Sequence, residues 1–308
     1  MVALSDSMRE AVRLAERVAT TDANVLITGE SGAGKDALSA LVHRRSPRAA
    51  QPFVKIDCAT LPPDLLEAEL FGYERGAFTG AGDSKPGRFE AAHRGTLVLD
   101  EIAHLSIEAQ AKLLRVIETR EFERLGGRRT IRVDARLIAL TNTDLDQAVK
   151  RRDFREDLFY RLNVVHIHIP PLRERPEDLP ALAQVFLRGY VAKHGRKASG
   201  MAPAVLTLLT EYEFPGNVRE LANTIERAVI VSAGKRVEVS DLPEVVRVAV
   251  QVQRRRKQPQ TLREVEAEHI TEVLAGTKGN KSEAARILGI SRKNLYEKLA
   301  RYELGSGK

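Results

Sequence analysis

The chain has 308 residues, enough for about two domains, and its 43% hydrophobic and 30% charged residues are typical of a globular protein. No apolar run is long enough to cross a bilayer and no N-terminal signal pattern is visible, so we expect no membrane association. The single cysteine, Cys58, excludes an internal disulfide and favours a cytoplasmic protein. We expect Cys58 to be a small buried residue; a nucleophilic thiol is the alternative.

Residues 1–165 alternate between two hydrophobic patterns. Helical spacing is found in residues 8–19, 37–44 and 108–119. Short apolar runs typical of buried strands occupy residues 24–28, 53–56, 96–99, 135–141 and 164–169. Because strands that alternate with helices form parallel sheets covered on both faces, the sequence predicts an α/β fold for this part.

The rest of the chain is predicted to be helical, with one interruption. Residues 176–232 have only helical patterns, and residues 261–303 are helical again. Between them, residues 243–260 lose periodicity and carry a run of Arg, Lys and Gln, which favours an exposed linker. We therefore expect an α/β domain at 1–172, a helical subdomain at 173–242, a linker at 243–260 and a small all-helical domain at 261–308.

The positive charge of the chain is concentrated near its C-terminus. The net charge is +7; residues 251–308 hold 13 Lys or Arg against 7 Asp or Glu, whereas residues 1–250 hold 36 against 35. A basic region of this kind favours binding to a polyanion. A solvated basic tail is the alternative, which charge alone does not exclude.

A glycine-rich segment lies between the strand predicted at 24–28 and the helix predicted at 37–44. Glycines let successive backbone N–H groups point at phosphates, the helix N-terminus adds a favourable dipole, and a lysine adds a positive charge. The residue after the lysine is Asp36, where the strict motif has a Ser or Thr that binds magnesium. An ordinary glycine-rich turn is the alternative. The predicted phosphate-binding residues are Gly29, Glu30, Ser31, Gly32, Ala33, Gly34, Lys35 and Asp36.

A second sequence element supports a nucleotide site. The apolar strand at 96–99 is followed by Asp100 and Glu101. In P-loop ATPases an aspartate at a strand end holds the magnesium shell, and a neighbouring glutamate can orient or deprotonate the attacking water. Further along, Arg155 and Arg161 can neutralise charge on the γ-phosphate of a neighbouring subunit's nucleotide. From their spacing alone, these arginines are equally well explained as partners in surface salt bridges.

The most specific segment is residues 69–81, which read ELFGYERGAFTGA and end in a full match to a GAFTGA signature. With this segment, the region from about residue 3 to 242 resembles the central AAA+ domain of sigma-54-dependent transcription activators, the bacterial enhancer-binding proteins. A plain glycine-rich hairpin is the alternative. The resemblance implies that the loop contacts sigma-54 through Gly76, Ala77, Phe78, Thr79, Gly80 and Ala81.

The resemblance also implies a set of roles around ATP and Mg2+. Asp100 and Glu101 match the Walker B pair, with Asp100 as the metal ligand. Asp57 stands where many members have an asparagine that restrains the glutamate, and an ionised aspartate cannot donate that amide hydrogen bond. The other implied roles are sensor I for Thr141 and Asn142, action in trans for Arg155 and Arg161, and a contact from the helical lid for Arg219. Arginines that act in trans require a ring, and the family forms hexamers or heptamers.

Residues 280–302 have the pattern of a helix-turn-helix. Ser291 is placed to cap the second helix, and Leu295 and Leu299 face back into the core at i, i+4 spacing. The segment resembles the Fis-type domain that ends most of these activators; an ordinary pair of amphipathic helices is the alternative. We expect the preceding helix at 261–274 to support dimerisation, which implies an inverted-repeat site. The outward residues predicted to bind DNA are Arg292, Lys293, Asn294, Tyr296 and Lys298.

Together these patterns predict an ATPase that activates bacterial transcription. We expect a homo-oligomer, dimeric at rest, that binds upstream double-stranded DNA and remodels the closed complex of the sigma-54 RNA polymerase holoenzyme. One alternative is a DNA-binding repressor or architectural protein with a vestigial AAA+ domain; another is a helicase or clamp loader, against which residues 76–81 argue. Members usually begin with a receiver or ligand-sensing domain, and the sequence does not decide whether this chain acts alone or belongs to a longer protein.

Overall fold

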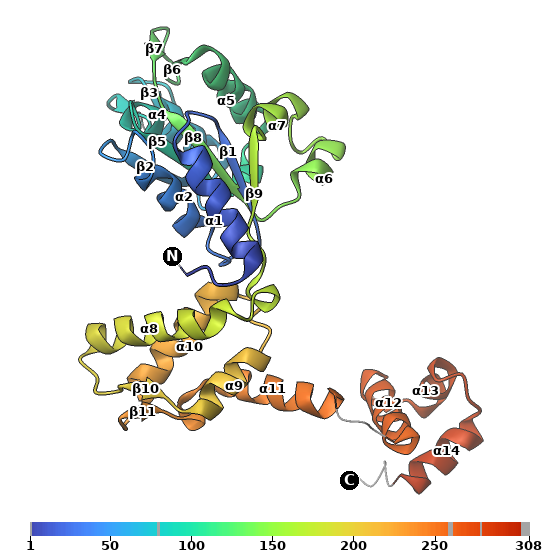
Figure 1. Ribbon diagram of the computed structural model, residues 1–308. Helices are drawn as coiled ribbons and strands as arrows, with labels where there is room; N and C mark the ends of the chain where they lie inside the picture. Colours follow the sequence, from blue (N-terminus) through green and yellow to red (C-terminus); the bar gives the residue numbers. More distant parts are fainter. Residues whose placement is uncertain (1, 79–80, 258–260, 278, 303–308) are drawn as a thin grey trace. The chain divides into compact units, whose positions relative to one another are not determined.

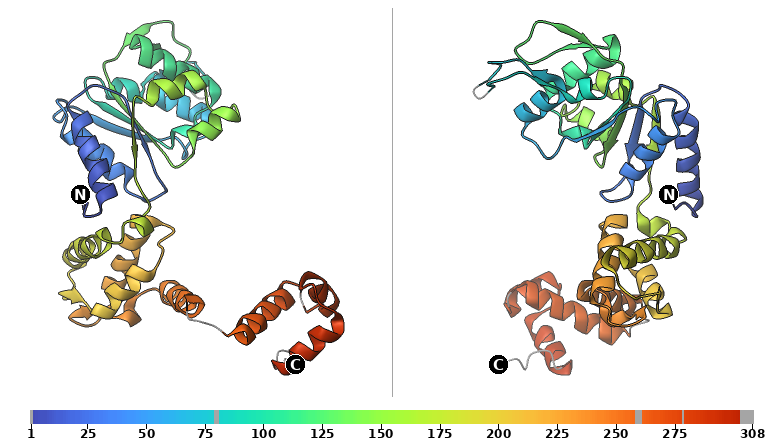
Figure 2. Two further views of the ribbon diagram at one scale, coloured as in Figure 1. Left: turned by 45° about the vertical axis from the view of Figure 1, so that its right-hand side comes forward. Right: turned by 90° about the vertical axis from the view of Figure 1, so that its left-hand side faces the viewer.

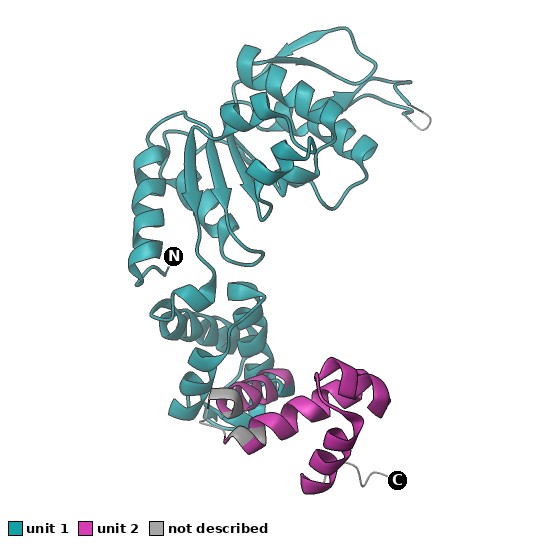
Figure 3. Ribbon diagram, turned by 90° about the vertical axis from the view of Figure 1, so that its right-hand side faces the viewer, with its two compact units in different colours: residues 1–244 teal, residues 245–308 magenta. Residues whose placement is uncertain are grey.

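The computed structural model describes residues 2–78, 81–257, 261–277 and 279–302. The chain forms two compact units, residues 1–244 and residues 245–308 (Figure 3). Across the described ranges, none of the helices has both the length and the apolar character needed to span a membrane.

The first unit is built on the predicted α/β sheet, which is confirmed. Its five strands are all parallel and lie in the order β2-β5-β8-β1-β9 (Figure 1). Successive side chains of a strand point to opposite faces, so each strand supplies apolar residues to both sides of the sheet. The strands are β1 (Val25–Thr28), β2 (Phe53–Asp57), β5 (Thr96–Asp100), β8 (Arg136–Thr141) and β9 (Val165–His168).

Helices cover the two faces of this sheet (Figure 2). On one face, Val98 and Ile138 pack in a buried cluster with the apolar sides of α1 (Asp6–Ala19) and α2 (Lys35–Arg44). On the other face, Leu97 and Leu137 belong to a larger buried cluster. The helices that contribute to this second cluster are α3 (Pro63–Phe71), α4 (Arg88–Ala91), α5 (Ile107–Thr119), α6 (Leu145–Lys150) and α7 (Glu156–Leu162).

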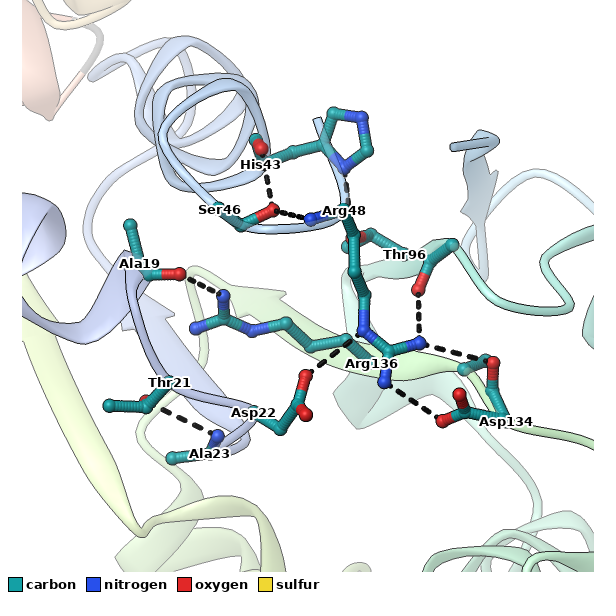
Figure 4. A network of polar contacts seen from close by, with 12 residues as sticks. Ala19, Thr21, Asp22, Ala23, His43, Ser46, Arg48, Thr96, Asp134 and Arg136 are labelled. Carbon is teal, nitrogen blue, oxygen red and sulfur yellow. Dashed lines mark hydrogen bonds and ion pairs between the residues drawn. The ribbon is translucent and has the colours of Figure 1, made fainter. Parts of the chain in front are cut away.

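A buried arginine fastens α1 to the sheet (Figure 4). Arg136, the first residue of β8, is 1% exposed and donates hydrogen bonds to Val18 O at 2.8 Å and Ala19 O at 3.0 Å. These carbonyls lie at the end of α1, beyond the regular hydrogen bonds of the helix, and Val18 O also accepts from Thr21 N. Burial lowers the pKa of Arg136. Beside it, Arg48 forms an ion pair of 2.9 Å with Asp134, which precedes β8.

A helical lid follows the sheet. Its helices are α8 (Asp178–His194), α9 (Pro203–Glu211) and α10 (Asn217–Val231). The stretch predicted to be purely helical also holds β10 (Gly200–Met201), which pairs in parallel with β11 (Arg236–Val237). Short elements elsewhere in this unit are β3 (Gly72–Tyr73), β4 (Lys85–Pro86), β6 (Glu121–Glu123), β7 (Thr130–Arg132), η1 (Ile102–His104), η2 (Leu172–Glu174) and η3 (Val239–Asp241).

The second unit corrects one prediction. Residues 243–260 were expected to form an exposed linker without periodicity, but Glu244–Lys257 is the helix α11. Val246 and Val250 are buried at i, i+4 spacing. Valine has a modest helix propensity because its β-branch restricts the side chain, and intervening exposed valines hide the period in the sequence. The remaining helices of this unit are α12 (Leu262–Gly276), α13 (Lys281–Ile287) and α14 (Arg292–Arg301).

Candidate nucleotide site and partner-binding surfaces

The predicted phosphate loop connects the end of β1 to the start of α2. Gly34 caps α2 in a left-handed conformation with φ of 115°. Gly32 also has a positive φ, and a Cβ atom there would lie 2.5 Å from Gly216 O of the lid. Only glycine fits this close approach of two backbones. The loop therefore curls against the N-terminus of α2, where backbone N–H groups and the helix dipole favour an anion.

Lys35 and Glu101 meet beside this loop. The Lys35 ammonium donates to Gly29 O at 2.8 Å and lies 3.6 Å from Glu101 Oε1, with only 8% of its side chain exposed. Glu101 follows β5 at a φ of 52°, a strained value for a non-glycine residue. Its other carboxylate oxygen accepts a 3.0 Å hydrogen bond from the backbone N–H of Asn142. The predicted Walker A, Walker B and sensor I residues are therefore brought together.

A pocket of about 180 Å³ lies between the loop, the end of β5 and the lid. All of the residues that line it, except Ala37, belong to the predicted site. They are Ser31, Gly32, Gly34, Lys35, Asp36, Ala37, Asp100, Glu101 and Arg219.

A magnesium ion would fit the acidic end of this pocket. Asp36 and Asp100 both form an ion pair with the ammonium of Lys55, which shows that one cation can reach both carboxylates. Burial alone would lower the pKa of Lys55, but the hydrogen bonds to Asp100 and Asp36 raise it. Within the described ranges, no group of three or more His, Cys, Asp or Glu side chains forms a metal cage. Mg2+ commonly uses one or two carboxylates and takes its other ligands from phosphates and water, so this donor set suits it.

The lid is bonded directly to the phosphate loop. The guanidinium of Arg173 in η2 donates two hydrogen bonds, of 2.9 and 2.6 Å, to the Glu30 carboxylate. Asn217 Nδ2 donates a third, at 3.0 Å. These bonds hold the pKa of Glu30 at about 2. Arg219, in the first turn of α10, donates to Ser31 Oγ at 3.1 Å. The predicted lid arginine is thus held above the loop by a Glu30–Arg173–Asn217 cluster.

Asp57 does not contact Glu101 through any bond in the described part of the chain. Its carboxylate accepts a 2.9 Å hydrogen bond from Ala59 N and so fixes the turn after β2. The neighbouring Cys58 is 1% exposed, and burial raises the pKa of its thiol to about 12. Cys58 is therefore the buried small residue that was predicted, because burial disfavours the thiolate that a nucleophile requires.

The two arginines predicted to act in trans lie on the surface, outside the pocket lining. Arg155 precedes α7 and pairs with Asp157 at 2.7 Å. Arg161 near the end of α7 pairs with Glu118 at 3.1 Å and is 61% exposed. Tyr160 beside it is 66% exposed. Exposed ion pairs contribute little to stability, so neither arginine is fixed in place by the chain itself.

The signature loop projects from the β3–β4 pair. Phe78 is 41% exposed, and its ring lies edge-on to Tyr73 with ring centroids 5.0 Å apart. A 2.9 Å hydrogen bond from Gly76 N to Ala81 O closes the base of the loop. Thr79 and Gly80 lie outside the described residues. The described part of the loop presents an aromatic side chain to solvent and does not bury it in the core.

The helix-turn-helix has the predicted internal geometry. Gly289 turns the chain with a φ of 66°, and Ser291 Oγ caps α14 by accepting a 3.2 Å hydrogen bond from Asn294 N. Leu295 is fully buried, and Leu299 is 7% exposed. Together with Ile270 of α12, these leucines form the core of the unit.

Five residues of the second helix were predicted to face outward. Four of them are exposed, and one is not. Arg292, Lys293, Asn294 and Tyr296 are exposed on α14. Lys298 was expected to point outward, but its side chain is 21% exposed and pairs with Glu266 of α12. A long lysine stem lets the ammonium turn back along apolar surface to a carboxylate on a packed helix. Lys298 thus joins α14 to α12.

Sequence reasoning missed three residues that surround the nucleotide pocket without lining it. Lys55 contacts Asp100 only because β2 lies beside β5, and Arg173 and Asn217 contact Glu30 only because the lid docks on the loop. The available signals were the alternation that puts Lys55 and Asp57 on one face of β2 and the position of Arg173 in the short segment between β9 and α8.

The fold and the pocket define a class: an AAA+ P-loop domain with a helical lid, followed by a helix-turn-helix domain. The family described as Sigma-54 interaction domain matches residues 1–168. The AAA+ ATPase lid domain matches residues 173–259, which includes α11, and the bacterial regulatory protein, Fis family, matches residues 261–302.

Curated relatives agree with these matches. Regulatory protein AtoC of Escherichia coli (strain K12) is 46% identical over 306 residues, which cover 97% of this chain and 66% of AtoC. Transcriptional regulatory protein FlbD of Caulobacter vibrioides is 43% identical and is covered over 70% of its length. The chain thus spans about two thirds of the length of these relatives. It belongs to the sigma-54-dependent transcriptional regulators.

Solved structures show the same fold. The crystal structure of NtrX from Brucella abortus in complex with ADP superposes with a TM-score of 0.77 at 34% identity, over 99% of this chain and 70% of NtrX. The structure of NtrX in complex with ATP superposes with a TM-score of 0.73 at 35% identity, over 98% of this chain and 69% of NtrX.

Proposed function

We propose that this protein hydrolyses ATP and uses the energy to remodel the closed complex of the sigma-54 RNA polymerase holoenzyme. The observation that carries the proposal is the contact of Lys35, Glu101 and the Asn142 backbone in a pocket that Arg219 also lines. A cation, a carboxylate and a lid arginine around one anion-binding loop are the groups that phosphoryl transfer requires. NtrX structures with ADP and ATP support nucleotide binding by this fold.

Each residue has a distinct task in the proposed reaction. The loop amides and Lys35 bind the phosphates, and Glu101 orients the attacking water and accepts its proton. Asp100, with Asp36 beside it, would hold Mg2+, which neutralises charge on the phosphate oxygens when bound. Arg219 contacts the nucleotide from the lid, so that the position of the lid depends on the bound nucleotide. The strained backbone at Glu101 and its bond to Asn142 fix the carboxylate in one orientation before ATP arrives.

The proposed active unit is a ring. Arg155 and Arg161 lie outside the pocket of their own chain and are solvent-accessible, which supports a role at the nucleotide of a neighbour. An arginine supplied in trans can accelerate phosphoryl transfer by about 10³-fold or more. We therefore propose a hexamer or heptamer that assembles from a resting dimer, so that hydrolysis depends on protein concentration.

The proposed output passes through two surfaces. Gly76–Ala81 contacts sigma-54 through the exposed Phe78, and α14 binds an inverted repeat upstream of the promoter. Arg292, Lys293 and Asn294 lie at the start of α14, the part of a recognition helix that usually reaches base edges. Tyr296 is exposed on the same helix.

The test is promoter opening in vitro by sigma-54 holoenzyme, measured with ATP for the wild type and for Phe78→Ala. We expect the variant to hydrolyse ATP within about twofold of the wild type, because Phe78 is exposed and is not among the residues that line the pocket, and to open no promoter. A Thr79→Ala variant should behave in the same way. Full promoter opening by both variants would contradict the proposed role of the loop. No ATP hydrolysis by the wild type would instead favour a DNA-binding repressor with a vestigial motor.

A further inference from the structure

We propose that Lys55 is an internal competitor for the divalent cation of the nucleotide site. Its ammonium bridges Asp36 and Asp100, the two carboxylates that a metal ion would use there. This inference deepens the proposed ATPase function and rests on it. It assigns to Lys55 the task of setting how readily the site accepts the metal.

The fold brings these three side chains together from separate elements. β2 lies beside β5 in parallel, with Lys55 paired to Val98. Because side chains alternate along a strand, Lys55 and Asp100 point to the face that carries Val98, which α2 covers. Asp36 lies in the first turn of α2. Two neighbouring strands and one helix N-terminus therefore place a cation and two carboxylates at one point.

The contacts are specific to Lys55. Its ammonium lies 2.7 Å from Asp100 Oδ2 and also contacts Asp36 Oδ1. In the part of the chain that the structure describes, Lys55 is the sole ion-pair partner of either carboxylate. The nearby Lys35 is engaged by Gly29 O and Glu101 instead. The two neighbouring lysines therefore pair with different acidic groups.

The competition follows from electrostatics. Two carboxylates that share one site repel each other unless a cation lies between them. The Lys55 ammonium provides that charge, and only 15% of the Asp100 side chain is exposed, so water screens the pair incompletely. A metal ion must displace the ammonium, and the flexible four-carbon stem of lysine lets it leave. Metal affinity is therefore lower than the carboxylates alone would give, and binding depends on phosphate oxygens to complete the coordination shell.

The experiment measures metal binding separately from catalysis. Mn2+, which prefers the same oxygen ligands as Mg2+, is titrated into the full chain with saturating ADP, and free Mn2+ is followed by electron paramagnetic resonance. The variants are Lys55→Met, which keeps the stem and removes the charge, and Lys55→Arg, which keeps a cation. Lys112→Met is the matched control, because Lys112 pairs with Glu67 on the surface away from the pocket. Circular dichroism confirms that each variant is folded.

We expect Lys55→Met to bind Mn2+ about three- to tenfold more tightly than the wild type, the range expected when partly exposed ion pairs no longer compete. Lys55→Arg and Lys112→Met should stay within about twofold of the wild type. Unchanged or weaker Mn2+ binding by folded Lys55→Met would overturn the inference.

Lys55 could instead act as a direct ligand of the phosphates, and ADP binding in EDTA tests this alternative. If Lys55→Met weakens ADP binding without metal, Lys55 is a phosphate ligand and the inference is overturned; equal ADP binding supports it. If the wild type binds no ADP even with Mn2+ present, the proposed ATPase function fails together with the inference. That outcome is distinguishable because it is seen in the wild type and not only in the variant.

Discussion

The nucleotide pocket and the proposed partner surfaces differ in how their charged side chains are held. In the pocket, Lys35 and Glu101 bond to each other and to the backbone, and both are largely buried. On the surfaces, Arg161 is exposed and forms one ion pair, with Glu118. Arg292 is exposed on α14. The pocket is positioned within one chain, whereas the surfaces are proposed to become ordered only against another subunit or DNA.

The largest effect is expected from a substitution in the buried nucleotide pocket. We expect Lys35→Ala to reduce ATP hydrolysis by about 10³-fold, because it removes the largely buried cation that would face the phosphates. DNA binding should be unchanged, since α14 belongs to the other compact unit. Steady-state phosphate release and a gel-shift assay measure the two activities. A Lys35→Ala protein that keeps more than a tenth of its hydrolysis would contradict the assigned site.

An intermediate effect is expected from a substitution on the exposed DNA-binding surface of α14. Arg292→Ala should weaken binding to the specific DNA site by about 10- to 100-fold, the usual cost of one lost base contact. ATP hydrolysis should not change. Lys298→Ala is the informative comparison, because its pairing with Glu266 predicts a loss of helix-turn-helix stability in addition to any loss of DNA contact. Fluorescence anisotropy with specific and nonspecific duplexes separates the two; equal losses on both duplexes for Arg292→Ala would show that it contacts only phosphates.

The sequence predicted the fold well because its signals are local. The strand before Gly29 and the strand before Asp100 are continuous apolar runs, and both are observed. The helix α11 was missed because only Val246 and Val250 of its several valines are buried, and the pattern that distinguishes them depends on packing. Ser291 was assigned correctly as a cap because a cap depends only on the three residues that follow it.

The site was predicted less completely because most of its contacts join residues that are far apart in the sequence. Lys35, Glu101 and Asn142 were found through motifs, but the bond from the Asn142 backbone to Glu101 depends on the order of β5 and β8 in the sheet. Lys55 and Arg173 lie outside any motif that was considered. Lys298 was misplaced because a side-chain rotamer, and not the helix face, decides where its charge lies.

The smallest predicted effect concerns the bond between the lid and the loop. The pKa of Glu30 is about 2 in the folded chain against an ordinary value of 4.5, because Arg173 and Asn217 bind its ionised form. A lowered folded pKa gives stability that is complete above about pH 4.5 and is lost as pH falls towards about 2. Because the side chain is 42% exposed, solvent screening reduces the contribution to about 1 kcal/mol.

Urea unfolding of Glu30→Gln measures this contribution. The difference from the wild type should be about 1 kcal/mol at pH 7 and should shrink between pH 4.5 and pH 3. Glu10→Gln, at an exposed position of α1, is the control and should show no such trend. A difference for Glu30→Gln that stays constant over this pH range would show that the lid bond does not depend on the charge of Glu30.

The central claim is that ATP is hydrolysed between two copies of this chain, and mixing two inactive proteins tests it most directly. Lys35→Ala inactivates the nucleotide pocket of the subunit that carries it. Arg161→Ala removes the arginine that the subunit supplies to the pocket of its neighbour. In mixed rings, an intact pocket on one Arg161→Ala subunit can face an intact arginine on a Lys35→Ala subunit. We predict that the mixture recovers hydrolysis well above the sum of the two proteins measured alone, with a maximum near equal proportions. Activity equal to that sum at every ratio would contradict a shared site.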